Sequence, residues 1–142
     1  TPPGSQNLFS VSAFSAQNIW VVGVDQNAHP LVEHWDGQRW SNIALPGSLV
    51  NPETSVRSIK VVSANDIWAV GSFYSNQALS PAQAIVLHWN GKAWLQISMP
   101  ALLSPANPPG SEAHGIIVSG GQLWIVGDAN SSGLILGQRT CP

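Results

Sequence analysis

Two pairs of tryptophans form the most ligand-like feature of the sequence. Trp35 and Trp40 flank a short Asp-Gly segment, and Trp89 and Trp94 flank a matching Asn-Gly segment. An indole ring presents a large flat apolar face with a polar N–H at its edge, and a sugar ring can stack on such a face. Aromatic rings at these positions also fill wide gaps between packed sheets. We expect packing to be their main role, and we predict Trp35, Trp40, Trp89 and Trp94 as the residues that would bind a ligand.

Few ionisable residues are available for catalysis or metal binding, since the 142 residues include only seven acids and four histidines. His34 and His88 hold equivalent positions in a repeat, so they point the same way, whereas the ligands of a metal site converge. Asp25, Asn27 and Asp128 carry oxygen atoms that suit Ca²⁺, but they lack a dense acidic spacing and favour turns. We therefore expect no catalytic residue, no metal site and no cofactor.

Two residues near the end of the sequence are candidates for covalent modification. Asn130-Ser131-Ser132 matches the acceptor pattern for N-glycosylation, which makes Asn130 a candidate glycosylation site. Cys141 is the single cysteine and cannot form a disulfide within the chain. Pairing with another chain and a free thiol both remain open for it.

The composition excludes several classes of partner. Charged residues make up 8% of the chain and the net charge is −2, so there is no basic patch for nucleic acid or for an anionic membrane. No apolar run is long enough to span a bilayer. Neutral polar residues dominate, which is typical of secreted and cell-surface domains, and we expect that location. The beginning, Thr1–Gly4, does not resemble a signal peptide and suggests the new end of a processed chain.

A nine-residue segment recurs three times without gaps around Trp20, Trp68 and Trp124. A serine begins each copy, and a tryptophan, a valine and a glycine follow at identical offsets. The residues around each tryptophan are apolar at successive positions, as in a strand buried on both faces. We therefore expect all three tryptophans in the core. The segments are Ser15–Gly23, Ser63–Gly71 and Ser119–Gly127.

A second block, His-Trp-Asp/Asn-Gly-x-x-Trp, follows at 34–40 and at 88–94. Its Asp-Gly and Asn-Gly pairs predict type I′ hairpins, in which both central residues have positive φ. In the third copy Gly137-Gln138 stands where His-Trp is expected. The predicted strands are 8–14, 57–62 and 115–118; 19–24, 67–73 and 123–126; 31–35, 84–89 and 134–136; and two that begin at Trp40 and Trp94 and end before Pro46 and Pro100.

These repeats predict an all-β fold in one domain, 1–142, built from propeller-type blades of four antiparallel strands. The first blade covers about 8–46, the second about 56–100, and an incomplete third about 113–142.

The repeats resemble those of bacterial extracytoplasmic β-propeller proteins, over residues 8–136. The Asp-Gly-x-x-Trp turn is similar to the Asp-box hairpin of sialidase-like propellers, although the full Asp-box sequence is absent. Sialidase activity, as that resemblance implies it, requires an arginine triad, an acid and a tyrosine nucleophile. The chain offers Arg39, Arg57, Arg139 and Tyr74. We expect Arg39 on an outer hairpin, away from a central site, so this activity is the third hypothesis.

Propellers close with about four to eight blades, which two complete repeats and a partial third cannot supply. We expect open flanks with exposed apolar residues such as Ile19, Val21 and Val70. The chain would then be a fragment of a longer propeller, a subunit of a ring, or a subunit completed head to tail by a strand of its neighbour. The leading hypothesis is a non-catalytic secreted or surface module that self-associates as a homo-oligomer. A lectin that binds glycans is the alternative.

Overall fold

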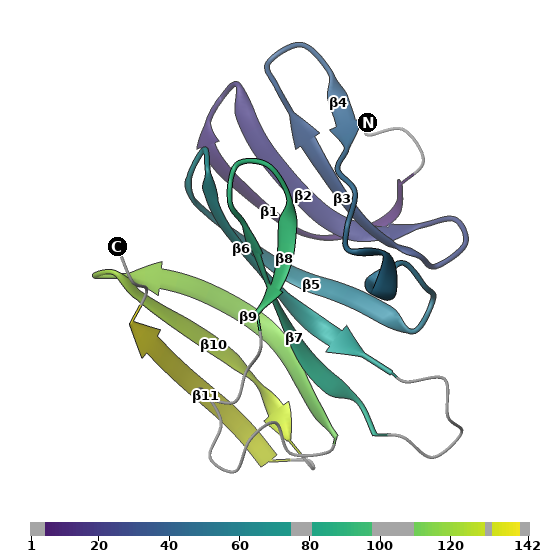
Figure 1. The fold of residues 1–142 in the computed structure, drawn as a ribbon, viewed down its shortest axis with the longest axis vertical. Helices are drawn as coiled ribbons and strands as arrows, with labels where there is room; N and C mark the ends of the chain where they lie inside the picture. Colours follow the sequence, from purple (N-terminus) through teal and green to yellow (C-terminus); the bar gives the residue numbers. More distant parts are fainter. Residues whose placement is uncertain (1–4, 75–80, 98–109, 130–131, 140–142) are drawn as a thin grey trace.

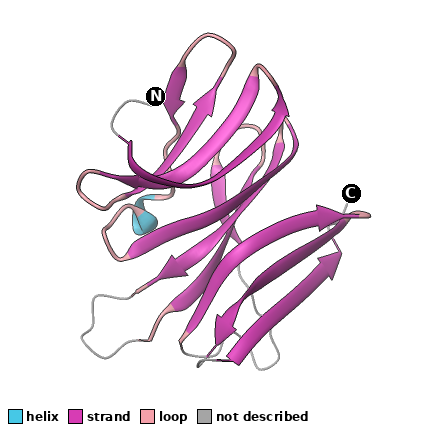
Figure 2. Cartoon of the chain, turned by 180° about the vertical axis from the view of Figure 1, so that it is seen from behind, coloured by secondary structure: helices cyan, strands magenta, loops and turns pink. Residues whose placement is uncertain are grey.

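The structure, a computed structural model, describes residues 5–74, 81–97, 110–129 and 132–139. The side chains of 5–6 and 134–139 are not described. This part of the chain is all-β and folds into three antiparallel sheets (Figures 1 and 2). Its one helical element is a single 3₁₀ turn, Gly47–Leu49.

Each sheet is a meander in which strands adjacent in sequence pair with one another. The third sheet has three described strands where the other two have four. Sheet 1 contains β1 (Ser5–Ser15), β2 (Asn18–Asp25), β3 (Pro30–Trp35) and β4 (Trp40–Asn42); sheet 2 contains β5 (Thr54–Ser63), β6 (Asp66–Phe73), β7 (Gln83–Trp89) and β8 (Trp94–Ile97); sheet 3 contains β9 (Ser111–Ser119), β10 (Gln122–Ala129) and β11 (Ser132–Arg139).

The sequence locates every one of these strands, but it underestimates the first strand of each sheet. β9 begins at Ser111, four residues before the predicted start. The prediction missed these residues because they show no apolar pattern. The first strands of the three sheets lie together, and β5 contacts both β1 and β9. The N–H of Ile59 donates to Ser10 Oγ at 3.3 Å and that of Val61 donates to Ser12 Oγ at 3.0 Å. Sheets 1 and 2 are thus joined by hydrogen bonds as well as by apolar packing.

The repeated glycine after each central tryptophan has a steric cause. A Cβ at Gly71 would lie 1.8 Å from the carbonyl oxygen of Ser55, and one at Gly127 would lie 1.9 Å from that of Glu112. Opposite both glycines the first strand has a register shift, which leaves Arg57 in β5 and His114 in β9 as extra residues. The glycine therefore lets the first strand bulge against the second.

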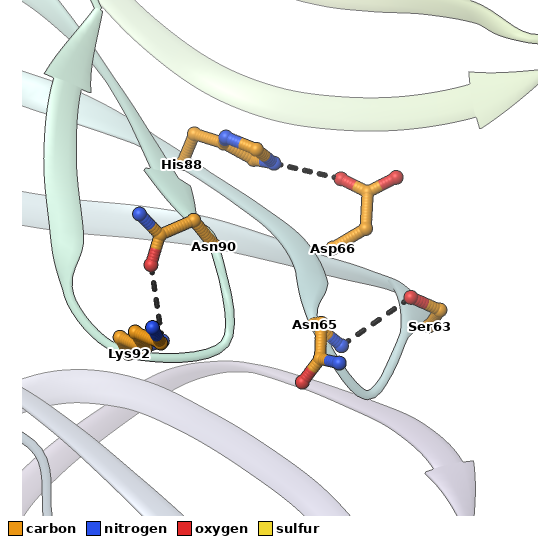
Figure 3. A network of polar contacts seen from close by, with 6 residues as sticks. All are labelled: Ser63, Asn65, Asp66, His88, Asn90 and Lys92. Atoms are coloured by element: carbon orange, nitrogen blue, oxygen red, sulfur yellow. Dashed lines mark hydrogen bonds and ion pairs between the residues drawn. The ribbon is translucent and has the colours of Figure 1, made fainter. Parts of the chain in front are cut away.

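The two predicted hairpins are confirmed, but their predicted turn type is wrong. Only the glycine of each pair has positive φ, 94° at Gly37 and 89° at Gly91. The Asp36 side chain closes the loop instead, since its Oδ1 accepts hydrogen bonds from the N–H groups of Gln38 and Arg39 at 2.8 and 2.9 Å. Asn90 binds its own loop in the same way, as Figure 3 shows for Lys92. A side-chain acceptor thus closes each loop.

Two apolar clusters hold the sheets together, one between sheets 1 and 2 and one between sheets 2 and 3. Alternate residues of β6 join different clusters: Ile67 and Ala69 the first, Trp68 and Val70 the second. We call the side of a sheet that carries Ile67 and its repeat equivalents the trailing face. The opposite side, with Trp68 and its equivalents, is the leading face. A central strand buried on both faces is confirmed for sheet 2.

Three expectations about exposure are wrong. Val70 is completely buried, because sheet 2 has a neighbour on both faces. Val21 is buried and Ile19 is half-buried on the trailing face of sheet 1. Trp124, expected in the core, is 39% exposed, because no described sheet packs on the leading face of sheet 3.

Candidate interaction surfaces

Trp89 and Trp94 pack between sheets 1 and 2. The ring centroid of Trp20 lies 5.4 Å from that of Trp89 and 6.0 Å from that of Trp94, and the second contact is edge to face. Trp94 is buried, while Trp89 is half-buried at the edge of the same cluster. The pair therefore covers the tryptophan of the preceding sheet, and the ring of Trp94 is not accessible to a ligand.

The two repeat histidines support the central tryptophans Trp20 and Trp68 from within their own sheets. His34 stacks on Trp20 at 4.4 Å, and His88 stacks on Trp68 at 4.3 Å. Each histidine Nε2 also meets an oxygen of the residue that begins the central strand, Asn18 Oδ1 at 3.1 Å or Asp66 Oδ1 at 2.9 Å (Figure 3). Burial lowers the pKa of His34, because a charged ring would lose its contact with water.

Trp35 and Trp40 form the same pair one sheet earlier. Their ring centroids lie 5.7 Å apart in a tilted arrangement, close to the 5.9 Å between Trp89 and Trp94. Both rings are half-buried, and no ring contact reaches them from another described sheet. Trp40 is therefore more exposed than its repeat equivalent Trp94.

The burial of the central tryptophan falls from one sheet to the next. Trp20 is 2% exposed beneath the Trp89–Trp94 pair, Trp68 is half-buried, and Trp124 is 39% exposed. The register explains the series. Trp68 faces sheet 3, in which Gln138 takes the position that Trp89 has in sheet 2. Trp124 pairs with Gly137, which takes the position of the stacked histidine His88.

Two outer faces expose residues whose equivalents are buried between sheets. On the leading face of sheet 3, Val126 is 48% exposed, whereas Val22 and Val70 are completely buried. On the trailing face of sheet 1, Val11 is 65% exposed, whereas its equivalent Ile59 in sheet 2 is 4% exposed. We call these the leading end face and the trailing end face. The first is centred on Ile117, Trp124 and Val126, and the second on Val11, Trp35 and Trp40.

Glu33 is the polar residue in the buried part of the trailing face of sheet 1, where Val21 and Leu31 are buried as well. It occupies the position of Leu87, and it is completely buried. Neither carboxylate oxygen has a hydrogen-bond partner among the described residues. Burial raises the pKa of this carboxyl group.

A group of polar contacts surrounds the beginning of β9. Tyr74, just after β6, donates a hydrogen bond from its hydroxyl group to Glu112, which links sheet 2 to sheet 3. This bond, with burial and the charge of Glu112, raises the pKa of Tyr74. His114 pairs with Asp128 within sheet 3.

Arg57 and His114 hold equivalent positions in sheets 2 and 3, because each is the extra residue of a bulge, as is Phe9 in sheet 1. The Arg57 guanidinium lies 5.4 Å from the centre of the Phe9 ring. The sequence alone does not indicate the Tyr74–Glu112 and His114–Asp128 contacts. The signal that locates Phe9, Arg57 and His114 is the repeated glycine, which marks the bulge opposite each of them.

The candidate calcium ligands lie in separate places. Asp25 Oδ1 accepts hydrogen bonds from the N–H groups of Asn27 and His29 at 2.7 and 2.9 Å, so its carboxylate closes a turn. Asp128 pairs with His114 in another sheet. Within the described ranges, no three His, Cys, Asp or Glu residues are grouped so that they could hold a metal ion.

The remaining candidate residues from the sequence are Arg39, Arg139, Asn130 and Cys141. Arg39 lies on the β3–β4 hairpin and its side chain is 80% exposed. Asn130 and Cys141 lie outside the described residues, as does the side chain of Arg139. No helix in the described part of the chain is long and apolar enough to cross a membrane.

No protein-family model matches the sequence, and no curated protein matches it significantly.

Proposed function

We propose that this protein is a non-catalytic interaction module of propeller-type blades, secreted or displayed at the cell surface, that associates with copies of itself. One observation carries the proposal: repeat positions that are buried between sheets inside the chain are exposed on its two end faces. Val11 and Ile59 illustrate it, at 65% and 4% exposure. Exposed apolar patches of this kind commonly mark protein–protein contacts.

The polar residues favour an interaction module over an enzyme. The acids near β9 are already engaged, Glu112 with Tyr74 and Asp128 with His114. The repeat histidines support core tryptophans. The secreted or surface location rests on the neutral polar composition and on the resemblance of the repeats to extracytoplasmic propellers.

Size-exclusion chromatography with light scattering tests the proposal. We expect a mass of two or more chains that falls towards that of one chain on dilution, because weak association follows mass action. Two copies would contribute six sheets, a number within the range of closed propellers. A chain that stays monomeric at high concentration would contradict the proposal.

Carbohydrate binding is a second candidate, and the half-buried Trp35–Trp40 pair is the observation in its favour. In sheet 2 the equivalent pair is occupied by Trp20, so only the pair in sheet 1 has rings free for a sugar. Binding to a glycan array that disappears in Trp35→Ala would support this candidate. Binding that survives the substitution would remove it.

A further inference from the structure

The contact between sheets 1 and 2 gives a template for how two copies of the chain would meet. In that contact the tryptophan of a leading face, Trp20, packs on a tryptophan pair of a trailing face, Trp89 and Trp94. Hydrogen bonds between β1 and β5 accompany it. Both halves of this arrangement occur once more, and within the described residues no further sheet packs on either of them.

The unused leading half is Trp124. It shares its register position with Trp20, and its exposure of 39% compares with 2% for Trp20. Beside it lies a shallow apolar hollow that Ile117, Val126 and the backbone of Gly115 help to form. Gly137 replaces the histidine that stacks on Trp20, so one more ring is missing over Trp124.

The unused trailing half is the pair Trp35 and Trp40. Its internal geometry is close to that of Trp89 and Trp94, with centroids 5.7 and 5.9 Å apart. Nearby, Val11 lies at the position that Ile59 fills in the internal contact. The trailing face of sheet 1 is thus built like the trailing face of sheet 2, with Glu33 in place of Leu87 as its polar departure.

We propose that Trp124 of one copy docks on Trp35 and Trp40 of a second copy, which continues the stacking of sheets from one chain to the next. The inference rests on the proposed self-association and names the surfaces that perform it. The occupant is a second copy because this chain itself carries the matching tryptophan pair. The contact is heterologous, since the two copies contribute different surfaces. It closes as a ring if the rotation between sheets allows it, and it otherwise extends as a filament.

Single substitutions test each surface. Trp124→Ser and Trp40→Ser should each weaken association by about 30-fold or more, because buried tryptophans at the centre of an interface dominate its affinity. Val11→Ser, at a strongly exposed position of the same trailing end face, replaces Trp40→Ser if that variant does not fold. Phe14→Ser is the matched control. Phe14 is exposed, and its equivalent Val62 is exposed in sheet 2 despite the internal contact. The control should associate like the unmodified chain.

A mixture of the two tryptophan variants distinguishes a heterologous contact from a symmetric one. The Trp40→Ser chain keeps Trp124, and the Trp124→Ser chain keeps the Trp35–Trp40 pair, so together they restore one intact interface. We expect light scattering to show complexes in the equimolar mixture at concentrations where each variant alone is monomeric. A symmetric contact between two Trp124 surfaces would give no such rescue and would overturn the inference.

The remaining outcomes separate this inference from the proposed function. If both variants associate as tightly as the unmodified chain, self-association stands and the assigned surfaces are wrong. If the unmodified chain is monomeric at high concentration, both proposals are wrong.

Discussion

At the residue scale, Glu33 is the clearest conflict between sequence position and environment. Its repeat equivalent Leu87 is an apolar core residue, and a carboxyl group buried in the same manner costs free energy unless it is paired. No described residue pairs with it. Burial accordingly raises the pKa of this carboxyl group, because the charged form loses more by leaving water than the neutral form does.

We expect Glu33→Leu to raise the free energy of unfolding by about 1–3 kcal/mol at pH 7. The gain should depend on pH. The native state holds the Glu33 proton more tightly than the unfolded state does, so the unmodified chain loses stability as pH rises from the unfolded pKa through the folded pKa. The difference between the two proteins should therefore be larger at pH 7 than at pH 4, as chemical denaturation at both values would measure.

Glu53→Gln is the control for this measurement, because the Glu53 side chain is exposed and the hydrogen bonds of this residue are made by its backbone N–H and carbonyl groups. It should change stability little at either pH. A Glu33→Leu chain less stable than the unmodified one at pH 7 would show that the carboxylate is stabilised by an interaction outside the described residues.

At the scale of the element, the repeated glycine and the loop acceptor explain why these strands pair as they do. Gly71 permits the bulge in β5, and the bulge turns Arg57 out of the ladder. Asn90 closes the β7–β8 hairpin through its side chain, which aligns Trp89 with Trp94. The hairpin closure thus positions the tryptophan pair that packs against sheet 1.

Gly71→Ala should destabilise the fold by about 3 kcal/mol, because the new Cβ would lie 1.8 Å from a backbone oxygen of β5, and neither strand can shift without loss of pairing. Thermal or chemical denaturation would measure the loss. Gly47→Ala is the matched control, since no atom lies within 4 Å of a Cβ at Gly47. If the two substitutions cost the same, the steric explanation for the repeated glycine is wrong.

At the scale of the whole molecule, stability depends on stacking one sheet on the next. Among the described sheets, sheet 2 has neighbours on both faces, while sheets 1 and 3 each have a neighbour on one. Repeat proteins gain their stability from such nearest-neighbour contacts, so equivalent residues contribute differently according to their place in the stack.

Ile59→Ala should cost about 3 kcal/mol, because it removes atoms from a packed contact between sheets. Val11→Ala, at the same repeat position, should cost less than about 0.5 kcal/mol at concentrations where the chain is monomeric. Denaturation at a series of protein concentrations would measure both. Under the proposed self-association, the cost of Val11→Ala should increase with concentration, since binding adds to apparent stability. Equal costs for the two substitutions in the monomer would contradict the repeat-based account of burial.

The sequence by itself determined the strands, their order and the three sheets. Local signals are sufficient for this: the apolar segments around the three central tryptophans, the Asp-Gly and Asn-Gly hairpins, and the repeat that relates one sheet to the next. It also indicated that Trp35, Trp40, Trp89 and Trp94 act in equivalent pairs, because the spacing within each pair is the same.

Only the tertiary structure decided which of these residues are covered. Trp20 and Trp124 are nearly indistinguishable in their local sequence, yet one is in the core and the other is on the surface, since burial depends on what the neighbouring sheet presents. The same reason explains why Val70 is buried and Val11 is exposed. The bulge contacts of Arg57 and the Tyr74–Glu112 bond also required the structure, because they join residues far apart in the chain. A repeated sequence specifies a unit and its two faces, and the stacking of units determines which faces remain open for a partner.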